Sequence, residues 1–248
     1  MTVWAIYLTA AAVGACVGSW LSTWALRAAR GEQSTRGRSR CDHCQTELSF
    51  ARTTPVLAYV LQGGRCANCA ALIDPLHLVG EIAGAAVATS ALAVVASSPG
   101  RAGLLIALGL VLLAGALIDA RTRRLPDALT GAAAILCLAL LLLGRRTEWI
   151  VGLAAAAVMG IVLLALRSVF ARRGGDAGLG LGDVKLLSGT ALWLGLAAPW
   201  ALASAAVMGL CAVALLRPTD RRIPFGPSIA ASVWVVGLVG EAHPWPRL

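Results

Sequence analysis

The sequence predicts an all-α membrane protein with about eight transmembrane helices and a small cytosolic region between the first two of them. Three observations lead to this fold class. Of the 248 residues, 58% are hydrophobic and 13% are charged, and the mean hydropathy is +0.79. That is more apolar surface than a soluble domain of this length could bury. Long uncharged segments recur along the chain, and the basic residues gather on one side of the bundle that these segments would form.

Segment 3–26 is the first expected helix. No charge precedes Arg27, and a helix of this length crosses a hydrocarbon core of roughly 30 Å. Because no basic segment comes before it, we expect a helix whose amino end starts outside rather than a cleaved signal peptide. A polar region, 27–75, follows. The later apolar segments are 76–96, 102–118, 128–144, 149–166, 186–216 and a last one from Ile223-Pro-Phe-Gly-Pro227 to about residue 240.

The apolar segment 186–216 is expected to form two short helices. Its 31 residues would make a single helix of about 46 Å, which is too long for one crossing. Pro199 offers a turn in the middle. With two helices, 17 of the 21 basic residues lie on the inner side, which is the asymmetry that bacterial membrane proteins show. The net charge of +9 therefore reflects membrane topology, and the basic loops lack the interleaved aromatic residues typical of nucleic acid binding.

Four cysteines in the polar region form two Cys-x-x-Cys pairs, Cys41 with Cys44 and Cys66 with Cys69. Four thiolates at this spacing suit tetrahedral Zn²⁺, which would order a region too short for a core of its own. The alternatives are two disulfides or a redox pair, and His43 is a further candidate ligand. The cytosolic side predicted for this region favours the metal, because that compartment keeps thiols reduced.

Three of the acidic residues in or beside the apolar segments are candidate site residues. Glu81 lies one or two turns inside 76–96, where a carboxylate either serves a function or snorkels to the interface beside His77. Asp119 ends the segment 102–118, and Asp183 precedes 186–216. Both aspartates are expected at cytosolic helix ends, where they can meet if the third and sixth helices pack together.

Two carboxyls brought together share one proton, because both cannot ionise cheaply. Such a pair suits peptide hydrolysis: the ionised member takes a proton from the attacking water, and the protonated member donates to the developing oxyanion. Gly178, Gly180 and Gly182 precede Asp183 at alternate positions and permit close approach of an extended substrate backbone. The alternative is a flexible turn before a helix. Lys185 is grouped with these glycines as a supporting residue.

Asp127 is a third aspartate close to this pair in the sequence. It follows Pro126 at the start of an apolar segment, so we expect it to be a helix N-cap rather than a catalytic residue. Ile223-Pro-Phe-Gly-Pro227 is interpreted first as a rigid start of the last helix, and its place on the active face leaves room for a role in lining the site.

These motifs together resemble the type IV prepilin peptidases, membrane aspartic proteases of the Gly-x-Gly-Asp class. The resemblance covers nearly the whole chain. It is carried by Gly18-Ser19-Trp20-Leu21, Ser39-Arg40-Cys41, Pro55-Val56-Leu57, Gly64-Arg65-Cys66, Glu81, Ile118-Asp119, Leu125-Pro126-Asp127, the glycine run with Asp183-Val184-Lys185, and Ile223-Pro-Phe-Gly-Pro227.

The resemblance implies a function and a division of the chain. Residues 1–26 are then the first helix, 27–75 the cytosolic four-cysteine zinc region, and 76–248 the transmembrane protease domain. Asp119 and Asp183 are the implied catalytic pair. The family cleaves basic leaders from pilin-like or pseudopilin precursors after a glycine, at the cytosolic face of the bacterial inner membrane. Many members also methylate the new amino terminus with S-adenosylmethionine, an activity associated with the cysteine region.

Two departures and two rival hypotheses stand beside this resemblance. Ser22 replaces the usual asparagine, and Leu76-His-Leu78 replaces an arginine-tyrosine-proline-leucine pattern, which affects leader or methyl-donor binding rather than the aspartates. A transporter that relays protons or ions through the carboxylates is the first rival, although the internal repeat of many transporters is not found. A membrane-tethered zinc module is the second, and it leaves both aspartates without a role.

Overall fold

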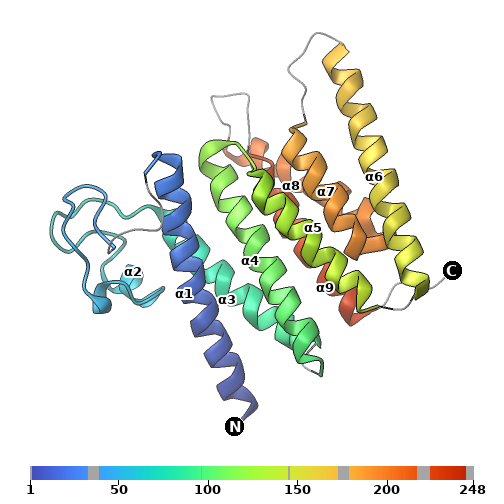
Figure 1. Ribbon diagram of the computed structural model, residues 1–248. Helices are drawn as coiled ribbons and strands as arrows, with labels where there is room; N and C mark the ends of the chain where they lie inside the picture. The colour runs from blue at the N-terminus through green and yellow to red at the C-terminus, as the bar shows by residue number, and fades with distance from the viewer. Residues whose placement is uncertain are drawn as a thin grey trace. The chain divides into compact units, whose positions relative to one another are not determined.

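The computed structural model describes residues 2–32, 39–95, 97–144, 146–172, 179–216 and 224–243 (Figure 1). The chain divides into two compact units, Met1–Leu92 and Ala93–Leu248. We describe each unit by itself. The three-part division predicted from the sequence stays a prediction.

The first unit contains two long helices and the cysteine region. Its elements are α1 (Val3–Ala29), a 3₁₀ turn η1 (Phe50–Arg52), α2 (Leu57–Leu61) and most of α3 (Pro75–Val95). Glycines on α1 face glycines on α3: a Cβ added at Gly18 would lie 2.0 Å from the Gly80 carbonyl oxygen, and one at Gly14 would lie 2.3 Å from that of Gly84. Small residues four apart let two membrane helices approach this closely.

The second unit is a helical bundle. It comprises α4 (Pro99–Thr122), α5 (Asp127–Leu142), α6 (Arg146–Arg172), α7 (Leu181–Leu194), the 3₁₀ turn η2 (Gly195–Ala197), α8 (Ala198–Leu216) and α9 (Gly226–Ala242). Helix α7 packs against α5 and α6, and α9 packs against α4 and α8 (Figure 1). The fully buried core between them includes Leu105, Leu108, Leu140, Leu187, Ile229 and Val233.

Segment 186–216 forms two helices, as predicted, but the turn is not at Pro199. The break lies at η2, where Gly195 has a φ of +53°, a conformation that glycine adopts without steric cost. Pro199 is the second residue of α8, a position where its missing N–H costs no helical hydrogen bond. Pro199 therefore marks the start of α8 and not the turn before it.

The fold class predicted from the sequence is confirmed. Among the described residues, five helical segments are long and apolar enough to cross a membrane, and α5 and α9 are shorter apolar helices. Large apolar side chains on α6 face outward, including Ile150 at 73% exposure and Ile161 at 68%. Such a surface requires lipid around it, so the chain is a multi-pass membrane protein.

Candidate active site and metal centre

Asp119 lies in the last turn of α4 and is buried, with 5% of its surface exposed. Its Oδ2 accepts a hydrogen bond from the backbone N–H of Gly226, at 2.8 Å. Gly226 is the first residue of α9. A buried carboxylate is tolerated only with such a partner. The start of α9, which is far from Asp119 in the sequence, therefore fixes the position of its carboxylate.

Asp183 is the third residue of α7 and is partly buried. Its Oδ2 accepts from the backbone N–H of Gly180 at 3.3 Å, which folds the carboxyl back over the start of the helix. The carboxyl of Asp183 also interacts electrostatically with that of Asp119. The two predicted aspartates, one at the end of α4 and one at the start of α7, thus lie within electrostatic range of each other.

The glycines before Asp183 have local packing functions. Gly180 is extended, with φ −65° and ψ 145°, so it does not use a positive φ. A Cβ at Gly182 would lie 2.8 Å from the Cβ of Leu125, and Gly182 therefore makes room for the loop between α4 and α5.

The segment before α7 is also bonded to α6, because an Arg167 N–H donates to the Leu179 carbonyl. Gly178 lies outside the described residues.

Asp127 is not a helix N-cap, so that prediction was wrong. The N-cap of α5 is Pro126, and Asp127 is the first helical residue. Its Oδ1 instead accepts from the Lys185 Nζ at 2.7 Å, in an ion pair with 77% and 50% of the two side chains exposed. Lys185, predicted as a supporting residue, therefore links the start of α7 to the first turn of α5.

Gly226 is a site residue that the sequence did not reveal as one. Its motif was interpreted as a rigid helix start that lines the site, but no pattern in the sequence pairs it with a carboxylate 107 positions away. A Cβ at Gly226 would lie 2.8 Å from both the Cβ and the Oδ2 of Asp119. The sequence did contain one indication, a glycine directly before the proline at the start of the helix. A glycine at such a position can indicate that another group approaches the backbone closely.

The four predicted cysteines come together in the first unit. Their sulfur atoms all lie within 4.8 Å of one another, with Cys41 3.8 Å from Cys69 and Cys44 4.0 Å from Cys66. Zn–S bonds of about 2.3 Å in a tetrahedron place sulfurs roughly 3.8 Å apart. The donor set and its geometry therefore fit a metal ion such as Zn²⁺. His43 is not among the clustered ligands.

The two cysteine pairs are held by the same backbone pattern, 25 positions apart. The Cys41 N–H donates to the Thr46 carbonyl at 3.0 Å, and the Cys66 N–H donates to the Ala71 carbonyl at 2.8 Å. Gln45 and Ala70, each four positions after the first cysteine of its pair, both have positive φ, 56° and 58°. Each pair is thus a tight knuckle that directs both sulfurs to one point.

The surroundings of Cys44 and Cys69 shift the pKa values of their thiols in opposite directions. Hydrogen bonds from the Asn68 amide and from Thr46 lower the pKa of Cys44 to about 5. The pKa of Cys69 rises to about 11: its backbone hydrogen bond with Ala71 lowers it, but burial and the neighbouring thiols outweigh that effect. Four thiolates this close need a bound cation to be ionised together.

Glu81 does not snorkel to an interface. It is buried, with 7% of its surface exposed, and its two oxygens accept from the Ser19 hydroxyl and the Val56 backbone N–H, each at 2.7 Å. Val56 has a φ of +63°, a strained conformation for a β-branched residue. Glu81 therefore anchors the loop before α2 onto α3 and compensates that strain with a charge-assisted hydrogen bond.

A pocket of about 490 Å³ lies in the first unit, next to these two features. Basic and acidic side chains both line it, together with Tyr59 and His77. The charged residues among them are Arg27, Arg30, Glu32, Arg40, Asp42, Arg52 and Glu81. A cavity of this size and mixed charge suits a small polar molecule that carries both signs of charge.

Comparison with known proteins identifies the family. Residues 106–215 match the Type IV leader peptidase family, and residues 12–95 match the Bacterial Peptidase A24 N-terminal domain. The prepilin leader peptidase/N-methyltransferase of Pseudomonas aeruginosa is 33% identical over 221 residues, which cover 82% of this chain and 72% of that protein. The chain belongs to the type IV leader peptidase family. The resemblance seen in the motifs is thereby confirmed.

Other members of the type IV leader peptidase family agree with this assignment. The prepilin leader peptidase/N-methyltransferase of Dichelobacter nodosus is 30% identical over 212 residues, covering 82% of this chain and 71% of the relative. That of Burkholderia pseudomallei strain K96243 is 35% identical over 201 residues, covering 78% of this chain. The matched part spans 64% of the Burkholderia protein. No solved structure matches the chain.

The two family matches cover the residues of both candidate sites. The range 106–215 contains Asp119 and Asp183, and the range 12–95 contains the four cysteines and Glu81. A peptidase family leaves the transporter hypothesis and the tethered-module hypothesis without support.

Proposed function

We propose that this member of the type IV leader peptidase family cleaves the basic leader from pilin-like or pseudopilin precursors. Cleavage follows a glycine, at the cytosolic face of the bacterial inner membrane. The observation that supports the proposal is the electrostatic interaction between the Asp119 carboxyl at the end of α4 and the Asp183 carboxyl at the start of α7. The names of the relatives, prepilin leader peptidase/N-methyltransferase, supply the substrate class.

Hydrolysis by this pair proceeds in two steps that return both carboxyls to their starting states. The ionised carboxyl takes a proton from water as the water oxygen bonds to the peptide carbonyl carbon, and the protonated carboxyl gives its proton to the carbonyl oxygen. The C–N bond then breaks. The leaving nitrogen takes the proton from the first carboxyl, and the re-forming carbonyl returns a proton to the second.

The chain's own residues hold the pair in place for this chemistry. The Gly226 N–H occupies Oδ2 of Asp119 and leaves Oδ1 available for the shared proton. The Gly180 N–H does the same for Asp183. The precursor's backbone must be extended at the cleaved bond, and its polar groups are satisfied within a membrane only where protein surrounds them.

The test of this proposal is a cleavage assay. Detergent-solubilised protein is incubated with a precursor whose leader ends in glycine, and the product is identified by its mass. We expect one cut after the glycine. A protein that binds zinc and is folded but leaves this precursor intact would contradict the proposal.

The first unit is proposed to methylate the new amino terminus with S-adenosylmethionine. The pocket beside the cysteine knuckles supports this role, because S-adenosylmethionine carries a carboxylate, an ammonium and a sulfonium group, and the pocket offers arginines and carboxylates together. Asp42 and Arg30 form an ion pair at 3.0 Å on its wall, and they would exchange partners with the ligand.

Binding of S-adenosylmethionine tests this second activity separately from cleavage. We expect saturable binding to the purified protein and an affinity about tenfold weaker in Asp42→Asn, since one charge partner is lost. Asp127→Asn, in the other unit, should bind normally. Wild-type protein that cleaves precursor but shows no binding by calorimetry would contradict the methylation proposal.

We propose that the four cysteines hold one structural zinc ion. When bound, the ion would supply the cross-link between the two knuckles, because the described polar region has few other buried apolar side chains. Purified, reduced protein should contain about one zinc per chain, and Cys66→Ser should lose it. Cys211→Ser, an exposed cysteine of α8, is the matched control. Zinc-free wild type, measured by mass spectrometry of metals, would show that the knuckles do not need the ion.

A further inference from the structure

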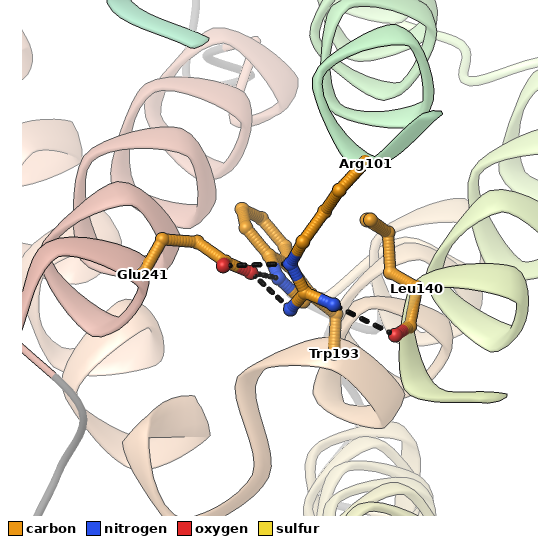
Figure 2. Close-up of polar contacts among 4 residues, drawn as sticks. All are labelled: Arg101, Leu140, Trp193 and Glu241. Atoms are coloured by element: carbon orange, nitrogen blue, oxygen red, sulfur yellow. Dashed lines mark hydrogen bonds and ion pairs between the residues drawn. The ribbon is translucent and has the colours of Figure 1, made fainter. Parts of the chain in front are cut away.

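Four residues form a closed polar cluster in the second unit, away from the aspartates. Figure 2 shows Arg101 of α4, Leu140 of α5, Trp193 of α7 and Glu241 of α9 converging on one point. The Glu241 carboxylate accepts from Arg101 at both oxygens, at 2.8 and 2.5 Å, and from the Trp193 Nε1 at 2.8 Å. A further Arg101 N–H donates to the Leu140 carbonyl at 3.3 Å.

The cluster is largely shielded from its surroundings. Only 24% of the Arg101 side chain and 10% of the Glu241 side chain are exposed. Burying such a pair costs desolvation energy that its attraction barely recovers, so a buried pair is weak evidence for stability. Its best-attested use is to specify one register among several, because any slip leaves a buried charge without its partner.

Trp193 fixes α7 to α9 by shape as well as by its hydrogen bond. A Cβ added at Gly237 would lie 2.0 Å from the indole ring, so the ring lies directly on the backbone of α9. Gly237 is one turn before Glu241, on the same side of the helix. Gly237 therefore leaves space for the Trp193 ring, and Glu241 accepts the hydrogen bond from the same side chain.

The cluster and the aspartates lie at opposite ends of the same three helices. Arg101 is 18 positions before Asp119 on α4, a distance of about 27 Å along the helix axis. Trp193 is near the end of α7, which begins two residues before Asp183. Helix α9 contacts Asp119 through its first residue and carries Glu241 in its last turn. Helix α9 thus contacts both α4 and α7 at the cluster and holds Asp119 at its other end.

We propose that Arg101, Trp193 and Glu241 form a clamp that sets the spacing and register of α4, α7 and α9 and thereby positions Asp119 and Asp183 for hydrolysis. They are positioning residues, since none of them touches the aspartates. The positioning part rests on the proposed function, whereas the clamp itself is a property of the helices. A displacement of about 1 Å at reacting groups can cost about 100-fold in rate.

Spin labels at positions 121 and 181 measure the spacing of the aspartate ends directly. They are introduced as genetically encoded amino acids, so that the cysteines stay in place. We expect the distance distribution to broaden in Arg101→Lys and Glu241→Gln, which keep the size of the side chains, and more in the two alanine variants. Ser98→Ala is the matched control, because Ser98 lies three positions before Arg101 and makes no side-chain cap hydrogen bond.

Cleavage kinetics separate positioning from general destabilisation. We expect kcat per folded molecule to fall about tenfold in Arg101→Lys and Glu241→Gln and up to about 100-fold in the alanine variants, with KM nearly unchanged. Trp193→Phe, which loses the N–H and the part of the indole that lies on Gly237, should fall between wild type and Arg101→Ala. The double variant Arg101→Ala/Glu241→Ala should be no slower than the slower single variant, because the residues act as one unit.

Each outcome decides the matter. An unchanged distance distribution in the clamp variants overturns the proposal, whatever the activity. A broadened distribution with unchanged kcat shows a clamp that does not position the aspartates and also overturns it. If wild-type protein cleaves no precursor, the proposed function fails, and the spin-label distances still judge the clamp by themselves.

Discussion

Replacing either Asp119 or Asp183 with asparagine should reduce precursor cleavage by about 100- to 10,000-fold. Asparagine keeps the size of the side chain but can neither take a proton from water nor donate one to the oxyanion. The loss should be nearly equal for the two positions, because the carboxyls act as a pair, and the double variant should be no slower than the slower single one. The measurement is the rate of leader release per folded molecule in detergent.

Asp127→Asn is the matched control for this pair. The change removes an exposed ion pair with Lys185, and such pairs contribute about 0–1 kcal/mol. We expect cleavage within about threefold of wild type. Activity that survives Asp119→Asn or Asp183→Asn, or that disappears in Asp127→Asn, would remove the proposed dyad.

Gly226→Ala should reduce kcat by about 100-fold in a protein that still folds. The added methyl group would lie 2.8 Å from the Asp119 Cβ and Oδ2, so either α9 or the carboxyl must move. Either movement breaks the Gly226 N–H bond to Asp119 and shifts the aspartate from its partner. The variant should keep its zinc, since the cysteines lie in the other unit.

Gly131→Ala provides the comparison for Gly226→Ala. Gly131 lies inside α5, and a Cβ there meets nothing within 4 Å. Alanine is about 1 kcal/mol more favourable than glycine within a helix, so this variant should be as active as wild type and slightly more stable. Equal kcat in Gly226→Ala and Gly131→Ala would show that the start of α9 does not position Asp119.

Local chemistry made much of this molecule readable from its sequence. The cysteine site could be predicted because a Cys-x-x-Cys pair forms its knuckle within six residues, and two such pairs need only one ion to join them. The helices could be predicted because twenty uncharged residues have no other way to satisfy their backbone in a bilayer. The aspartates could be predicted as site residues because placing a carboxylate at the edge of an apolar segment costs free energy, and such residues are usually functional.

The predictions that failed concern contacts between distant segments or the choice among equivalent local roles. The turn between α7 and α8 went to Gly195 rather than Pro199, because a glycine accepts positive φ and a proline at a helix start needs no turn. Asp127 could either cap its own helix or pair with Lys185, and only the packing of α5 against α7 placed that cation within 2.7 Å. For Glu81 the sequence left two alternatives open rather than giving a wrong prediction, and the structure shows its carboxylate held by Ser19 and Val56.

The sequence by itself determined that the chain spans a membrane, which segments form its helices, which four cysteines form one cluster, and which two aspartates lie at the ends of apolar segments. Each of these follows from a short stretch of residues and the cost of leaving it in lipid or water. Only the tertiary structure decided that Gly226 holds Asp119, that Gly182 makes room for Leu125, and that Arg101, Trp193 and Glu241 meet. Such contacts depend on the register of helices far apart in the chain, and many registers bury the same apolar faces equally well.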